Sequence, residues 1–133
     1  MSQHSMCVLV VEPTEELRRA TECMLRLLFH HEGLVLVASI AEARQHLAQG
    51  HTFDLVLCSA DWEHESGTDL LKVLRQSGDA VAFVLTSSNR AWREVGEYRV
   101  YCAGHKATFL FLGMVLLDHY RHAIDIALEL VGR

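Results

Sequence analysis

The segment FDLVLCSADWEHESGTDLLKVLR, residues 53–75, decides the fold. It begins with an almost unbroken apolar run, continues with an acidic loop, and ends with apolar residues spaced as on one face of a helix. An apolar run without alternation is typical of a strand covered on both faces, as in a parallel sheet. Ser66 followed by Asp69 fits a capping box, which predicts that the helix begins there. The segment therefore predicts a buried strand, a loop and an amphipathic helix.

The rest of the chain repeats this alternation of apolar runs and amphipathic stretches. The runs predict strands at 7–11, 34–38, 53–58, 80–85 and 107–112. Helices are expected at about 14–31, 40–49, 66–78, 87–101 and 114–131. Gly33, Gly50 and Gly78 are expected to end the first three helices, because glycine accepts the left-handed conformation that follows many helices. The order predicts an α/β fold with a doubly wound, five-stranded parallel sheet between two layers of helices.

Length and composition narrow the class of protein. A chain of 133 residues predicts one domain, 1–133, and its hydrophobic content of 50% is that of a globular protein. The net charge of −5 and the lack of a basic run argue against a nucleic-acid partner. No segment has 18 consecutive apolar residues, so we expect no membrane span. The N-terminal MSQHSM lacks a signal-peptide pattern, which predicts a cytoplasmic protein.

In order, spacing and local sequence the elements resemble the receiver domains of bacterial response regulators, the CheY-like family. The resemblance is carried by the apolar segments 8–11, 53–57 and 83–86, and by Gly67 with the leucines that follow it. In that family the third strand ends with the aspartate that accepts a phosphoryl group, eight positions before the loop glycine. Counting back eight positions from Gly67 gives Ser59. The resemblance therefore implies a CheY-like, flavodoxin-like fold in which Ser59 occupies a degenerate phosphoacceptor position.

The resemblance also implies where the other groups of the family's site fall. Two acidic residues after the first strand help bind Mg²⁺ in receivers, and they correspond to Glu12 and Pro13. The hydroxyl that ends the fourth strand corresponds to Thr86, which is retained. The lysine that ends the fifth strand corresponds to Phe111, or to Leu112 if the loop is one residue longer, and neither carries a charge.

An acyl phosphate adds about two negative charges, which a divalent cation and an ammonium group must offset. Proline cannot coordinate a metal ion, and a serine hydroxyl without a positioned base is a poor nucleophile. We therefore expect no phosphotransfer, no enzymatic activity, no metal site and no cofactor. The expected function is that of a degenerate, or pseudo-, receiver of a bacterial two-component regulator, acting through phosphorylation-independent protein contacts or dimerisation.

Other readings of the same residues stay open. Asp61, two residues past Ser59, is the alternative phosphoacceptor of an atypical receiver that is still phosphorylated, at Asp61 or at Ser59. The vacated pocket lined by Glu12, Ser59 and Thr86 is the alternative site of a small-ligand sensor. The acidic loop that contains Asp61 is an alternative metal site together with Glu12. Ser59 and His64 resemble a hydrolase pair, but no G-x-S-x-G elbow surrounds Ser59.

The last predicted helix carries more apolar residues than one contact requires. Beside one apolar stripe that suits a sheet face, Leu116, Ala123 and Leu130 form part of a second stripe. In receivers the face made by the fourth helix, fifth strand and fifth helix commonly mediates dimerisation or output. Trp92 and Tyr98 lie on the predicted fourth helix and are of a type enriched at interfaces. We therefore expect a homodimer, or a contact with another protein, through this face.

Overall fold

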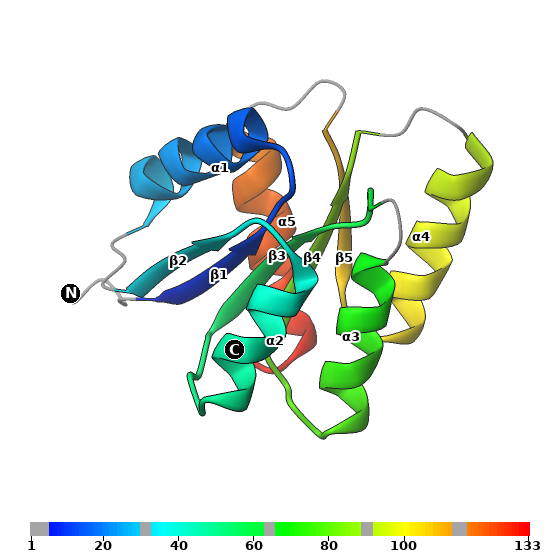
Figure 1. Ribbon diagram of the computed structural model, residues 1–133. Helices are drawn as coiled ribbons and strands as arrows, with labels where there is room; N and C mark the ends of the chain where they lie inside the picture. Colours follow the sequence, from blue (N-terminus) through cyan, green and yellow to red (C-terminus); the bar gives the residue numbers. More distant parts are fainter. Residues whose placement is uncertain (1–5, 30–32, 63–65, 89–91, 113–116) are drawn as a thin grey trace.

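A computed structural model describes residues 6–29, 33–62, 66–88, 92–112 and 117–133, in which five strands alternate with five helices (Figure 1). The strands are β1 (Cys7–Val11), β2 (Gly33–Val37), β3 (Leu55–Ser59), β4 (Ala82–Ser87) and β5 (Thr108–Phe111). The helices are α1 (Glu15–Leu28), α2 (Ile40–Ala48), α3 (Gly67–Gln76), α4 (Trp92–Gly104) and α5 (Leu117–Leu130).

All strand pairs are parallel, and the order across the sheet is β2-β1-β3-β4-β5. The strand order reverses next to β1, because the chain first moves to β2 and then returns past β1 to β3. This is the doubly wound arrangement predicted from the sequence, and it is confirmed. In such sheets, sites form outside the carboxyl ends of the strands, close to the point where the order reverses.

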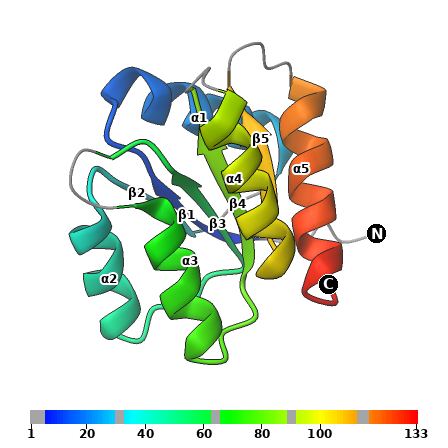
Figure 2. The ribbon, with the colours of Figure 1, turned by 90° about the vertical axis from the view of Figure 1, so that its right-hand side faces the viewer.

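The side chains of successive strand residues point to opposite faces of the sheet, and each face is covered by its own helices. Val8 and Val10 of β1 share a core cluster with residues of α1 and α5, whereas Leu9 and Val11 pack with residues of α2, α3 and α4. Figures 1 and 2 show the resulting three layers. All five residues of β3 are buried, which is why its sequence reads as an apolar run.

Two of the three glycines predicted to end helices do so. Gly50 and Gly78 have φ values of 82° and 79° directly after α2 and α3, as predicted. Gly33 does not end α1; the helix ends at Leu28, and Gly33 is the first residue of β2. A Cβ atom on Gly33 would lie 3.0 Å from the sulfur of Cys7 on the paired strand, so close strand contact accounts for this glycine.

The α-helices in the described ranges are all too short or too polar to cross a membrane.

Candidate functional site

The sheet brings the predicted site residues to one edge, at the carboxyl ends of β1, β3, β4 and β5. Ser59 is the last residue of β3 and pairs with Thr86 of β4, while Ser87 pairs with Phe111, the last residue of β5. Glu12 follows β1 directly, and its backbone amide continues the pairing with β2. The residues matched to the receiver site therefore lie along one edge.

Gly67 explains the fixed spacing between Ser59 and the helix that follows it. Gly67 is the first residue of α3 and is buried. A Cβ atom built on it would lie 2.2 Å from the carbonyl oxygen of Ser59, a separation that no side chain can occupy. The start of α3 therefore packs directly on the backbone at the end of β3, and only glycine permits this approach.

Ser59 is 3% exposed, and its two oxygen atoms accept hydrogen bonds from the loop that follows β3. Its hydroxyl oxygen accepts a hydrogen bond from the backbone amide of Asp61 at 3.1 Å. Its carbonyl oxygen accepts one from the indole Nε1 of Trp62. These contacts fold the loop after β3 back over the end of the strand, so the serine has a structural role at this edge.

Asp61 joins the loop after β3 to the end of β4. One carboxylate oxygen accepts a hydrogen bond from the hydroxyl of Ser87 at 2.8 Å. The other accepts from the backbone amide of Ser88 at 2.8 Å and from the hydroxyl of the same residue at 3.3 Å. Hydrogen bonds to an ionised carboxylate are stronger than those between neutral groups. This bridge holds two of the loops that surround the predicted phosphoacceptor position.

The partners of Asp61 are not predicted by the sequence pattern. Ser87 was expected at the start of the fourth helix, but this residue ends β4, and α4 begins at Trp92. Thr86, the predicted match to the receiver hydroxyl, is 7% exposed, and its hydroxyl donates a long bond of 3.5 Å to the carbonyl of Cys58. The sequence feature that could have indicated these partners is the run of three hydroxyl residues, 86–88, at the end of a predicted strand.

Glu12 is the buried carboxylate of the edge, at 5% exposure. Burial raises its pKa, the backbone amide of Thr14 opposes this by donating to Oε2 at 3.0 Å, and the negative charge of Asp61 adds to the rise. Pro13 is exposed and offers no ligand atom on its side chain. Arg18 donates to the carbonyl oxygen of Glu12 at 2.8 Å, so it binds the backbone here.

Among the described residues, the carboxyl edge of the sheet has neither a lysine at the end of β5 nor a set of metal ligands. Phe111 is half-buried at the end of β5, and the backbone of Leu112 donates to the carbonyl of Ser87 at 2.8 Å. Within the described ranges, no group of three or more His, Cys, Asp or Glu side chains is placed to hold a metal ion. Residues 63–65, which include His64 and the remaining acids of the loop, lie outside the described residues.

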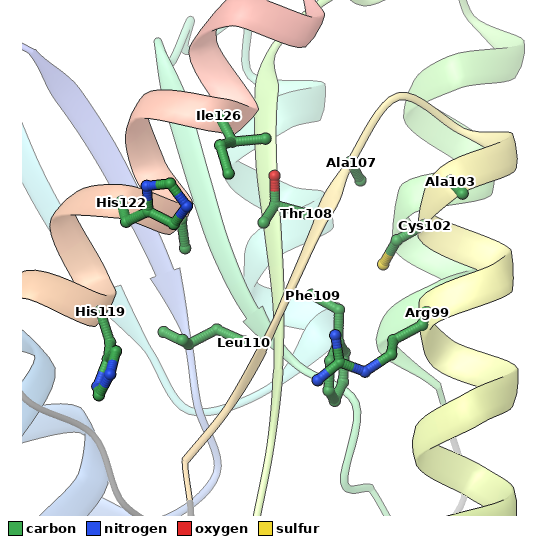
Figure 3. Close-up of a pocket in the computed structure, with 11 residues that line it drawn as sticks. Arg99, Cys102, Ala103, Ala107, Thr108, Phe109, Leu110, His119, His122 and Ile126 are labelled. Atoms are coloured by element: carbon green, nitrogen blue, oxygen red, sulfur yellow. The ribbon is translucent and has the colours of Figure 1, made fainter.

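A groove of about 400 Å³ lies over β5 between α4 and α5, on the face predicted to be an interface. Its lining includes Arg99 and Ala103 of α4, Leu110 of β5, and His122 and Ile126 of α5 (Figure 3). The groove is therefore lined by apolar side chains together with a guanidinium group and imidazole rings.

Two residues of α4 pack on the aromatic ring of Phe109. Tyr98 stacks on it, with ring centroids 5.8 Å apart, and the guanidinium carbon of Arg99 lies 5.4 Å from its centroid. Burial raises the pKa of the Tyr98 hydroxyl, and the charge of Asp61 adds to the rise. Tyr98 thus packs on the sheet and is only partly exposed.

One of the predicted interface residues is in the core. Ala123 lines the groove, but it is 4% exposed and packs with Ile124 and Ala127 of the same helix against the sheet, so it does not lie on an exposed second stripe. Leu130 is 42% exposed. Leu116 and the side chain of Trp92 lie outside the described residues. Helix α5 packs on β4, β5 and α1 together, so its buried face is wider than one stripe.

Comparison with known proteins identifies the fold. No family model matches the sequence, and no curated protein matches it. A response regulator receiver protein from Sinorhizobium medicae WSM419 superposes with a TM-score of 0.75, at 18% identity over 95% of this chain and 96% of that one. The receiver domain of an HD-domain protein from Pseudomonas fluorescens Pf-5 gives a TM-score of 0.71, at 19% identity over 93% and 98%. The chain has the CheY-like receiver fold.

Proposed function

We propose that the chain is a receiver-like signalling module that works through protein contacts and does not accept a phosphoryl group. The observation that carries this proposal is the bridge from Asp61 to Ser87 and Ser88 beside a buried Ser59. Hydrogen-bond donors at the end of β4 already have a carboxylate as their partner, supplied by the loop after β3. The chain thus contains its own fixed negative group between these loops.

The groups needed for phosphoryl chemistry are replaced one by one along the same edge. Pro13 stands at a metal-ligand position and Phe111 at the lysine position. A phosphoryl group on Ser59 would place about two more negative charges near Glu12 and Asp61. Because burial already raises the pKa of Glu12, this edge disfavours further negative charge. The proposed module is therefore not an enzyme and is not switched by phosphorylation.

Asp61 is a poor acceptor for the same structural reason. Both of its carboxylate oxygens accept hydrogen bonds, from Ser87 and from Ser88. Attack on a phosphoryl donor would break at least one of these bonds without a cation to replace it.

Treatment with acetyl phosphate and Mg²⁺, followed by intact-mass spectrometry, tests the absence of phosphotransfer. We expect no mass increase, and we expect beryllofluoride to leave the tryptophan fluorescence unchanged, because Trp62 reports directly on the loop beside Ser59. A stoichiometric mass increase of one phosphoryl group contradicts the proposal, whether it is a stable ester on Ser59 or a labile acyl phosphate on Asp61. An authentic receiver with an aspartate acceptor, treated in parallel, shows that the reagents are active.

The contact surface that we propose is the groove face formed by α4, β5 and α5, used in a constitutive homodimer. Val100 is 74% exposed and lies on α4 three positions before Ala103, which lines the groove. Residues three apart on a helix share a face. An apolar side chain this exposed next to the groove supports an interface there.

Sedimentation of matched variants tests this surface. We expect a dimer that Val100→Glu dissociates without loss of fold. Leu27→Glu is the matched control, because Leu27 is 72% exposed on α1, which lies on the other face of the sheet from α4 and outside the groove lining. A monomer at high micromolar concentration, or equal effects of the two substitutions, contradicts the proposed dimer. Ala123→Glu is unsuitable, because Ala123 is in the core.

A further inference from the structure

The end of α2 positions two histidines by a backbone motif. The helix ends at Ala48, and Gly50 follows in the left-handed conformation with φ of 82°. The amide of Gly50 donates to the carbonyl of Leu47 at 3.1 Å, and the amide of His51 donates to the carbonyl of His46 at 3.2 Å. These two bonds define a Schellman motif, in which a contact between the side chains at positions 46 and 51 is usual.

That contact is normally apolar, but here both positions carry imidazoles. The Nδ1 atoms of His46 and His51 lie 2.9 Å apart, with ring centroids separated by 5.1 Å and planes inclined by 37°. His51 is exposed and His46 is half-buried. The backbone thus brings two nitrogen ligands together at a solvent-accessible position, far from the carboxyl edge of the sheet.

We propose that His46 and His51 form a two-imidazole binding site for a divalent transition-metal ion, with Cu²⁺ as the preferred ion. This proposal is independent of the function proposed above. Two metal–nitrogen bonds of about 2.0 Å that end on atoms 2.9 Å apart enclose an angle of about 93° at the metal. A right angle between neighbouring ligands is that of square-planar or tetragonal Cu²⁺ and Ni²⁺.

Tetrahedral Zn²⁺ fits this spacing less well. An angle of about 109° with the same bond length needs nitrogens about 3.3 Å apart, so the pair must open by about 0.4 Å. The Irving–Williams order also places Cu²⁺ above Ni²⁺ and Zn²⁺ for imidazole ligands. We therefore expect Cu²⁺ to bind most tightly.

Metal binding requires a small movement of both rings. The two Nδ1 atoms now face each other nearly along the line of the ring centroids, as in a hydrogen bond with one donor and one acceptor. For both lone pairs to converge on one ion, each ring must turn by about 40°. The ring that carries its proton on Nδ1 must also take the other neutral tautomer, with the proton on Nε2. The exposure of His51 leaves space for this rotation.

The remaining coordination positions are filled by water. In the described part of the chain, these two histidines are not joined by a third His, Cys, Asp or Glu ligand. An open site of this kind has a preorganised pair of ligands and exchangeable positions for a further ligand. Protonated imidazole cannot bind a metal, so affinity must fall as the pH is lowered.

Calorimetric titration of the full chain with CuCl₂ in a weakly coordinating buffer tests the site. We expect His46→Gln and His51→Gln each to weaken the tightest Cu²⁺ site by at least about tenfold, because loss of a second-shell partner alone costs about 10–100-fold. Electron paramagnetic resonance of the 1:1 complex should show two equatorial nitrogens. The double variant His119→Gln/His122→Gln, whose residues lie on α5, should keep the tightest site.

Substitution of Gly50 separates positioning from ligation, since it leaves both imidazoles in place. Asn tolerates the left-handed conformation and Val does not, so Gly50→Asn should bind Cu²⁺ nearly as well as the unmodified chain and Gly50→Val several-fold more weakly. Unchanged affinity in both histidine variants, or one nitrogen in the resonance spectrum, overturns the proposal. Circular dichroism of each variant verifies that the fold is retained.

Discussion

Gly67→Ala should destabilise the protein although it adds only one methyl group to a helix. The new Cβ atom would lie 2.2 Å from the carbonyl oxygen of Ser59 and 2.9 Å from a methyl carbon of Leu85. Normal contacts are more than 3 Å, so the end of β3 and the start of α3 must separate by about 1 Å. Neither can move easily, because β3 is hydrogen-bonded to strands on both sides.

The size of the effect follows from two opposing contributions. Overpacking a buried position costs about 1–3 kcal/mol, and we expect the upper end because the closest atom belongs to the backbone. Alanine has a higher helix propensity than glycine, which stabilises the helix by up to about 1 kcal/mol. The net loss in the free energy of unfolding is therefore about 2 kcal/mol. For a chain of this length, such a loss lowers Tm by about 6–10 °C.

Urea unfolding followed by circular dichroism measures this loss, and Gly96→Ala is the matched control. Gly96 lies inside α4, is exposed, and has no atom within 4 Å of an added Cβ. This control should gain about 0.5–1 kcal/mol from helix propensity alone. If Gly67→Ala is as stable as Gly96→Ala, the close approach of α3 to Ser59 is wrong, and with it the structural reason for the eight-residue spacing.

Three further outcomes test the carboxyl edge. Mg²⁺ should bind only weakly, since Glu12 is a single carboxylate beside a proline, and micromolar affinity by calorimetry would contradict this. The pKa of Glu12 is raised in the native state above its ordinary value of 4.5. At pH values between these two pKa values the native state binds more protons than the unfolded chain. Stability therefore falls as the pH rises through the native pKa. Glu12→Gln should therefore raise the urea midpoint at pH 7 and give no gain near pH 4; a gain independent of pH would refute the assignment. Asp61→Asn should lower the free energy of unfolding by about 1–2 kcal/mol through its weaker bonds to Ser87 and Ser88, whereas Asp125→Asn on the exposed side of α5 should change it by less than about 0.5 kcal/mol.

Most of the fold could be predicted because its signals are local and repeated. Each buried strand is an apolar run, and the observed strands begin and end within two residues of the predicted ones. The error at Gly33 has a different cause. Glycine after a helix usually ends it, but here a close contact with Cys7 on another strand favours glycine, and no local pattern reports such a contact.

The candidate site was predictable in position but not in its contacts. The spacing from Gly67 identified Ser59 as the end of β3, since the strand and the helix start are both visible in the sequence. The contact of Asp61 with Ser87 depends on how two loops fold over the edge, and residue periodicity says nothing about loop conformation. Ala123 was misplaced because a helical stripe does not reveal how many neighbours a helix has.

The central place of β3 has a consequence for mutational tolerance. Its residues contact strands on both sides, and its last residue is covered by α3 and by the loop that follows. A saturation mutagenesis screen for folded protein should therefore find positions 55–59 and Gly67 among the least tolerant of the chain. That pattern would look like the signature of an active site, although it would arise from packing alone. Sensitivity to substitution at Ser59 is accordingly no measure of retained chemistry in this protein.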